Sequence, residues 1–150
     1  MDALLDQEEG PSSPFAYPDS RGYLTIARGV CVDKRIPGAG LPPSAIAEAN
    51  RVRTDEARQR AASLPGFSAC NPVRQAVLVS LCFQLGSMDG WPDFQACLAA
   101  GNYEGAADNL LYADVATETP SKLLQETPDR CRREAQMLRS GVRVGVPNQP

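Results

Sequence analysis

The feature that most constrains the fold is an apolar run from Val73 to Leu85, in which only four of thirteen residues are polar. Asn71 and Pro72 stand directly before it, a capping residue followed by proline at the first helical position. A helix with so little polar surface must be buried on most sides. A chain of 150 residues is long enough to enclose such a helix in one domain. We therefore expect this helix to form the core.

The segments before this helix predict a small N-terminal part. Two β-prone runs, 15–17 and 23–27, flank a turn-forming segment at 18–22 and so predict a hairpin. Residues 31–43 are rich in proline and glycine and predict an irregular connection. Residues 44–63 carry acid–base pairs at helical spacing, which predicts a long, mostly solvated helix.

Further helices are expected at both ends of the chain and after the core helix. The first covers residues 2–9 and is stopped by Gly10 and Pro11. Two more cover 92–99 and 103–113, and a polar connection through Pro120 follows them. The last helix begins at Thr127 and Pro128 and ends near Gly141. The predicted fold class is therefore α+β, a β-hairpin part and a larger helical part joined by a long helix.

The composition excludes several kinds of active site. The chain has no histidine, which removes Ser-His-Asp and Cys-His nucleophiles, His-ligated zinc and imidazole pH switches. Its five cysteines include no Cys-x-x-Cys pair, so neither a zinc ribbon nor a redox motif is present. We expect no metal and no cofactor, and acid–base chemistry must fall to carboxylates. Cys82 and Cys97 lie in apolar helical runs and are expected to be buried structural thiols.

Charge and hydropathy exclude further classes. The net charge is −3 and no basic stripe alternates with aromatic residues, so nucleic-acid binding is not expected. No run approaches about 18 consecutive apolar residues, the length of a membrane span. The start, Met1 to Asp6, lacks the basic and apolar regions of a secretory signal. We expect a monomer that is soluble in the cytoplasm where it is made.

Three polar residues in consecutive N-terminal elements carry the candidate chemistry. Glu9 ends the first predicted helix, Asp19 lies in the hairpin turn and Thr25 lies in the second strand, so their side chains could converge on one cleft. Two carboxylates across a cleft are the usual equipment for glycoside hydrolysis. Acidic pairs at this spacing are also common on protein surfaces, and taken alone they are better read as surface carboxylates.

Ordered motifs give these residues a context. Glu9-Gly10 and the run from Asp19 to Ile26 resemble the front end of the phage-type lysozymes, where eight and five residues separate Glu, Asp and Thr. Further matches follow in the same order: Val73-Arg74-Gln75-Ala76, Phe83-Gln84-Leu85-Gly86, Phe94, Tyr103, Ala106-Ala107 and Thr127-Pro128-Asp129-Arg130. The resemblance covers most of residues 8–141 at low identity.

The resemblance implies a single two-lobed, lysozyme-like domain over residues 1–150. Its lobes would be 10–43 and 1–9 plus 66–150, with 44–63 as the connecting helix. The implied enzyme is a muramidase that cleaves the β-1,4 bond between N-acetylmuramic acid and N-acetylglucosamine, with inversion, in phage lysis or entry. Its partner would be the peptidoglycan glycan strand. It would leave the host cytoplasm for the periplasm with the help of a holin, or travel in the virion.

The resemblance also implies residue roles. Glu9 would be the general acid, Asp19 would orient or deprotonate the attacking water, and Thr25 would hydrogen-bond that water. The implied substrate-binding residues are Tyr23, Phe83, Gln84 and Gly86, and Arg130 would sit against Glu9. A neighbouring cation lowers a carboxyl pKa, whereas a general acid needs its pKa raised. Desolvation must then compensate, or Arg130 mainly positions Glu9.

The chain also departs from the family pattern. Nine residues, rather than eight, separate Glu9 from Asp19, and the net negative charge gives no long-range attraction to an anionic wall. Two alternatives stay open: a lysozyme-like wall-binding or virion structural module with little or no activity, and an unrelated helical interaction protein. Trp91, the only tryptophan, is more typical of packing than of a sugar platform.

Overall fold

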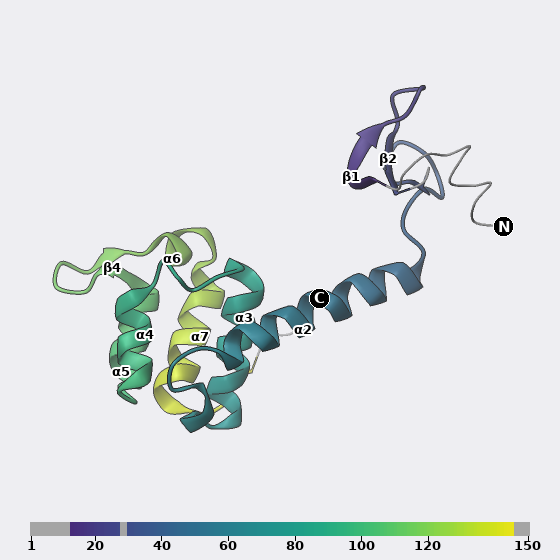
Figure 1. Cartoon of the computed structure of the whole chain (residues 1–150). Coiled ribbons are helices and arrows are strands. Elements are labelled where there is room, and N and C mark those ends of the chain that lie inside the picture. The colour runs from purple at the N-terminus through teal and green to yellow at the C-terminus, as the bar shows by residue number, and fades with distance from the viewer. Residues whose placement is uncertain (1–12, 28–29, 146–150) are drawn as a thin grey trace. The chain divides into compact units, whose positions relative to one another are not determined.

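The computed structural model describes residues 13–27 and 30–145, which form a mixed α+β structure. The chain divides into two compact units, Met1–Arg51 and Val52–Pro150. The described part of unit 1 holds a small antiparallel sheet and the start of a long helix, and unit 2 is mainly helical (Figure 1). The coarse α+β prediction is confirmed. The helix expected at 2–9 lies outside the described residues.

Unit 1 is built on the predicted hairpin. Strand β1 (Ser13–Pro18) pairs antiparallel with β2 (Leu24–Ala27), with Tyr17 opposite Thr25. A third strand, β3 (Val30–Cys31), pairs with the other edge of β2. The prediction of an irregular connection from residue 31 was therefore wrong at its start. The ladder extends to Val32, whose amide donates to the Leu24 carbonyl at 2.9 Å.

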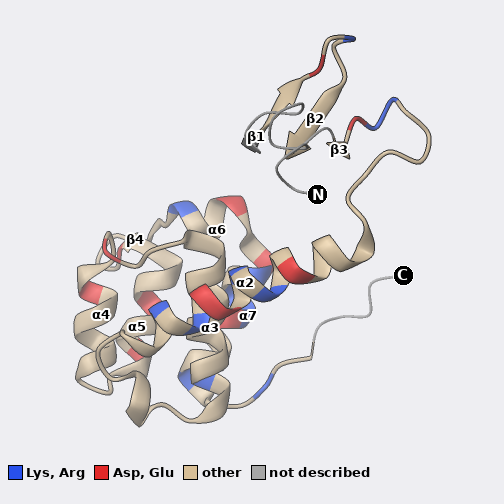
Figure 2. Cartoon of the chain, turned by 45° about the vertical axis from the view of Figure 1, so that its right-hand side comes forward, with Lys and Arg blue, Asp and Glu red and all other residues tan. Residues whose placement is uncertain are grey.

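Helix α2 (Pro43–Ala62) confirms the predicted long helix. Its expected acid–base pairs form: Glu48 with Arg51 at 2.6 Å, Asp55 with Arg58 at 3.0 Å and Glu56 with Arg60 at 3.4 Å. Both signs of charge therefore follow the helix in Figure 2. Near its end, small apolar residues make contact with the core, and Ala57 and Ala61 are fully buried there.

A tight glycine turn follows α2 and leads to the 3₁₀ helix η1 (Phe67–Ala69). Gly66 has a φ of 78°, in the left-handed region that favours glycine. A Cβ at this position would overlap the Leu98 carbonyl oxygen. The sequence therefore needs glycine here for two reasons, the backbone angle and the close approach of another helix.

Helix α3 (Pro72–Leu85) is the predicted core helix. The Asn71 side chain caps it by accepting the Arg74 amide at 3.0 Å. Only one face packs into the interior, where Val77, Leu78, Leu81 and Cys82 are buried, whereas Ala76 and Phe83 are exposed. The prediction that this helix is buried on most sides was therefore wrong. Gly86, with a φ of 75°, ends the helix. Asn71 and Pro72 therefore set the start of the helix, and Gly86 sets its end.

The remaining elements of unit 2 are α4 (Pro92–Ala99), α5 (Tyr103–Leu111), β4 (Tyr112–Asp114), β5 (Thr119–Pro120), α6 (Lys122–Glu126) and α7 (Pro128–Ser140). In this unit, α5 and α7 make the most extensive contacts, and α3 packs mainly against α7. The polar connection predicted through Pro120 was wrong, because it contains the β4–β5 ribbon and α6. Ser121 starts α6 by accepting the Leu124 amide at 3.0 Å.

Helix α7 starts at the predicted residue but without the predicted cap. Thr127 makes no side-chain cap: its hydroxyl donates to the Leu123 carbonyl at 3.1 Å and accepts the Gln84 amide at 3.1 Å. The other end of α7 is fastened to the start of α3. Arg74 donates to the carbonyls of Leu138 and Arg139 at 2.8 and 2.9 Å, and Asn71 donates to that of Gly141 at 2.9 Å.

Two further findings concern the interior and the helices. Cys82 and Cys131 are buried, and burial raises the pKa of the Cys131 thiol to about 11. Cys97 is half-buried and contacts the Asn109 amide, so its expected burial is only partial. Within residues 13–27 and 30–145, no helix combines the length and the apolar composition that crossing a membrane requires.

Candidate active site

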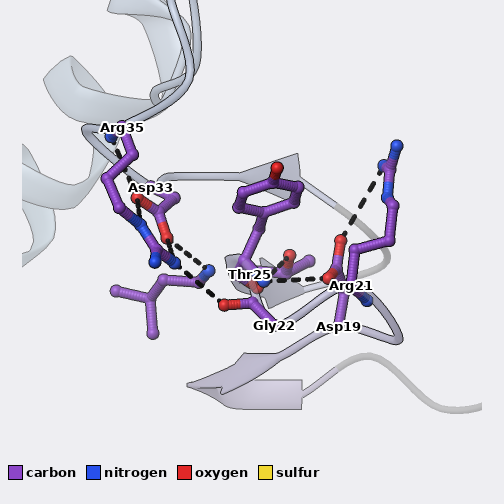
Figure 3. Close-up of polar contacts among 8 residues, drawn as sticks. Asp19, Arg21, Gly22, Thr25, Asp33 and Arg35 are labelled. Carbon is purple, nitrogen blue, oxygen red and sulfur yellow. Dashed lines mark hydrogen bonds and ion pairs between the residues drawn. The ribbon is translucent and has the colours of Figure 1, made fainter.

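The predicted water-activating residue, Asp19, lies in the turn between β1 and β2. Its Oδ1 accepts the backbone amides of Arg21 at 2.8 Å and Tyr23 at 2.9 Å (Figure 3). Gly22, with a φ of 77°, lets the chain turn back at this point. The Tyr23 amide contributes most to lowering the pKa of the Asp19 carboxyl, and the Arg21 amide adds to it. Asp19 is therefore ionised at neutral pH.

The second oxygen of the Asp19 carboxylate is less engaged. Among the described residues, the nearest cation to Oδ2 is the Arg21 guanidinium at 3.9 Å, on a side chain that is 77% exposed. Such a loose ion pair fixes neither group. The turn therefore immobilises one oxygen and leaves the other able to accept a hydrogen bond from water.

Thr25 is placed next to this turn but is enclosed. Its exposed fraction is 2%, and its hydroxyl donates to the Tyr23 carbonyl at 3.1 Å. The hydroxyl can still accept a hydrogen bond, since only its proton is used. In this arrangement Thr25 fixes the strand after the turn.

A second carboxylate in unit 1, that of Asp33, was not predicted as important. The Arg35 guanidinium donates to both of its oxygens, at 2.8 and 2.5 Å, and the Leu24 amide donates to Oδ2 at 3.0 Å (Figure 3). These hydrogen bonds, that of Arg35 first, hold the pKa of Asp33 far below its ordinary value. Since both oxygens are occupied, Asp33 has a structural role.

Tyr23, a predicted substrate-binding residue, has two arginines near its ring, Arg21 and Arg35. The guanidinium carbons of Arg21 and Arg35 lie 5.6 and 5.4 Å from its ring centroid. Both distances are within the range of a cation–π contact. Before α2, the charged residues that Figure 2 shows lie at the β1–β2 turn and in the segment after β3.

The remaining predicted residues are in unit 2, at the end of α3. The Gln84 amide donates to the Thr127 hydroxyl at 3.1 Å. Its Oε1 is buried and has no hydrogen-bond partner among the described residues. Phe83 is 40% exposed and has the Arg53 guanidinium 5.5 Å from its ring centroid. Gln84 thereby joins the end of α3 to the start of α7.

Arg130 of α7 forms a partly buried polar cluster with Glu134 of the same helix and with Ser80, which lies one turn before Gln84 on α3. Its Nε donates to Glu134 Oε1 at 3.0 Å, and its Nη2 donates to Ser80 Oγ at 2.9 Å. Ser80 in turn donates to the same glutamate oxygen at 2.6 Å. The Glu134 side chain is 5% exposed, and that of Arg130 is 37% exposed. The positive charge of Arg130 is therefore largely neutralised.

The predicted site residues thus fall into two groups. Asp19, Tyr23 and Thr25 come together in unit 1, and the structure joins α3 to α7 through Gln84 and through Arg130 in unit 2. Glu9, the predicted general acid, lies outside the described residues, and so does its predicted contact with Arg130. Residues 13–27 and 30–145 contain no cluster of three or more potential metal ligands.

Comparison with known proteins adds no relative. No protein-family model matches the chain, and no curated protein sequence matches it. The functional argument therefore stands on the residues and their geometry.

Proposed function

We propose that this chain is a peptidoglycan muramidase that cleaves the β-1,4 bond between N-acetylmuramic acid and N-acetylglucosamine by inverting single displacement. The observation that carries the proposal is the state of Asp19. It is ionised, one of its oxygens is fixed by two backbone amides, and the other can accept a hydrogen bond from water. These are the properties of a carboxylate that activates a water molecule.

In this mechanism the two carboxyls have opposite protonation states. Glu9 would protonate the leaving glycosidic oxygen, while Asp19 would take a proton from the water that attacks the anomeric carbon from the opposite face. The water needs room, so an inverting enzyme keeps its two carboxyls roughly 6.5 to 9.5 Å apart. Thr25 supports the arrangement by fixing the strand that follows Asp19.

The pairing of Arg130 supports the proposed role of Glu9. A free guanidinium beside Glu9 would lower the pKa of the acid and oppose its function. Glu134 neutralises Arg130 through a hydrogen bond of 3.0 Å within a partly buried cluster. An arginine paired in this way would depress the pKa of an adjacent acid less strongly than an unpaired arginine would.

The decisive experiment measures release of reducing sugar from purified peptidoglycan by the whole chain. Asp19→Asn should lower kcat by at least about a hundredfold, the usual contribution of a general base. Glu9→Gln should abolish the reaction. Asp114→Asn is the matched control, because Asp114 also accepts amides in a turn, from Ala116 at 2.9 Å and Thr117 at 3.4 Å.

Two results would contradict the proposal. Full activity of Asp19→Asn, with a native circular dichroism spectrum, would show that another group activates the water. Binding to sacculi without any release of reducing sugar would favour a wall-binding or virion structural module instead. The Asp114→Asn control should retain parental activity, since its turn has no part in the proposed chemistry.

A further inference from the structure

Trp91, the only tryptophan of the chain, has no role in the proposed reaction, and it lines a cavity of about 280 Å³. The cavity lies in unit 2, between the start of α4, the junction of α5 with β4, and the start of α6. Its size is just below the range of small-molecule sites, which begins at about 300 Å³. It can therefore take one small ring-shaped ligand.

The walls of this cavity are held by backbone hydrogen bonds. The Trp91 amide donates to the Met88 carbonyl at 2.9 Å, and the Trp91 carbonyl accepts the Gln95 amide at 3.1 Å. At the start of α6, the Ser121 hydroxyl donates to the Leu110 carbonyl at 2.6 Å. Tyr112 is the first residue of β4 and is paired with Pro120 of β5. A ligand would thus meet a preformed site, which costs little ordering on binding.

Two aromatic side chains give the cavity flat apolar surfaces. Trp91 and Tyr112 are both half-buried and pack against the core on one side, while each also lines the cavity. Aromatic faces carry partial negative charge and attract groups with partial positive charge, such as the C–H bonds of a sugar ring. Each of these residues also carries a polar hydrogen at its edge, which can bond a hydroxyl.

Donors and acceptors line the same cavity. The Asn109 amide nitrogen is committed to the Gly105 carbonyl at 2.8 Å, which orients the amide and leaves its oxygen as an acceptor. Asp93 adds a carboxylate, and Lys122 adds an ammonium whose contact with Glu126, at 3.7 Å, is loose. A hydroxyl is both donor and acceptor, so a polyol can use all of these groups.

The charges of the cavity select between ligand classes. Asp93 and Lys122 carry opposite charges, so the site has no net preference for an anion or a cation. A phosphate would meet the carboxylate, and a quaternary ammonium would meet the lysine. An aromatic surface bordered by mixed donors and acceptors suits a neutral ring that bears hydroxyls.

We propose that this cavity, defined by Trp91, Asp93, Asn109, Tyr112 and Lys122, is a non-catalytic binding site for one pyranose residue. It is separate from the residues proposed to cleave the glycan. The pyranose class follows from the cavity, and only the choice of N-acetylglucosamine as a probe rests on the proposed function. A second sugar site on unit 2 would hold the enzyme on its polymer between cleavage events.

The chain provides its own reporter for the test. Because Trp91 is the only tryptophan, all tryptophan emission comes from this cavity. Titration of the full chain with the β-1,4 disaccharide of N-acetylglucosamine, and separately with methyl glucoside, should give a saturable change in emission for at least one sugar. Tyr112→Phe should raise Kd about 3- to 10-fold, the loss expected for one hydrogen bond.

A matched pair of variants isolates the contribution of the cavity. Asp93→Asn should raise Kd about tenfold, since a charged acceptor becomes a neutral one. Asp129→Asn should leave Kd unchanged. Both aspartates are the second residue of a helix that begins with proline, but Asp129 is in α7, outside the cavity.

The outcomes separate this site from the proposed hydrolase. Asp19→Asn should bind sugar with the parental Kd. Sugar binding by the parental chain without any release of reducing sugar would retain the site and contradict the proposed reaction. No saturable change with either sugar would overturn the site, as would equal Kd values for the parent, Asp93→Asn and Tyr112→Phe. A response to tetramethylammonium but not to sugars would also overturn the proposed ligand class.

Discussion

Arg130 and Glu134 form one ion pair, but removing either partner should not cost the same. The Glu134 side chain is 5% exposed and that of Arg130 is 37% exposed. Without Arg130, the carboxylate stays buried with the Ser80 hydroxyl as its remaining described partner, at 2.6 Å. Without Glu134, the guanidinium can recover part of its hydration. The difference in exposure therefore predicts an asymmetry in stability.

The magnitudes follow from this difference. Arg130→Met should reduce the free energy of unfolding by about 3 to 5 kcal/mol, the usual cost of leaving a buried charge unpaired. Glu134→Gln keeps the size of the side chain and an acceptor for Arg130, so its cost should be about 1 to 2 kcal/mol. A chain of 150 residues loses about 2 to 4 °C in Tm per kcal/mol, so Arg130→Met should lower Tm by at least about 6 °C.

Urea unfolding followed by far-ultraviolet circular dichroism measures these energies. Arg132→Met is the matched control: it is in the same helix, and its contact with Asp129 is at 4.0 Å between two exposed side chains. That pair should contribute less than about 1 kcal/mol. The double variant Arg130→Met with Glu134→Met should recover most of the lost stability, because apolar groups often replace a buried pair without loss. Equal losses for Arg130→Met and Glu134→Gln would refute the reasoning.

Four further outcomes are expected. Gly66→Ala should cost at least about 2 kcal/mol more than Gly101→Ala in urea unfolding, since both sites have positive φ but only at Gly66 would a Cβ meet another backbone; equal costs would exclude the steric contribution. Arg74→Met removes two hydrogen bonds to carbonyls at the end of α7 and should cost about 2 to 4 kcal/mol, with faster amide exchange in the last turn of that helix. The pKa of Asp33 is lowered in the folded state, so the stabilisation of the fold by its carboxylate is present above its ordinary pKa of about 3.9 and is lost as the pH falls further. Amide NMR of unit 1 should therefore show acid unfolding, and Asp33→Asn, which already lacks the ion pair, should not share it. Since the pKa of Asp19 is also lowered, the acid limb of kcat/KM should lie below pH ~4, and a limb near pH ~6 would point to another base.

The parts of the fold that sequence alone predicted are those with local signals. Asn71, Pro72 and Gly86 mark the ends of α3 by backbone chemistry that acts within a few residues. The charge pairs of α2 have helical spacing regardless of what surrounds the helix. These features depend on neighbours in sequence, so a sequence pattern is enough to find them.

The parts that were missed depend on short elements or on distant neighbours. Strand β3 and helix α6 are too short to show a period, so the sequence gives them no distinct pattern. Thr127 is of a residue type that caps helices, but its hydroxyl accepts the amide of Gln84, 43 residues earlier, instead of a backbone amide of α7. Glu134 lies among charged residues of α7, a pattern typical of a solvated helix. Its burial involves a hydrogen bond from Ser80, 54 residues earlier, which no local pattern predicts.

The attachment of α3 to α7 also constrains how the chain is made. The carbonyls that Arg74 binds belong to residues 64 and 65 positions later in the chain. At a synthesis rate of roughly 5 to 20 residues per second, the ribosome needs about 3 to 13 s to supply them. During that interval the most apolar segment of the chain has no final partner, and premature termination before α7 would release it in this state. Such fragments should depend on chaperones and precipitate without them, whereas the finished chain protects itself.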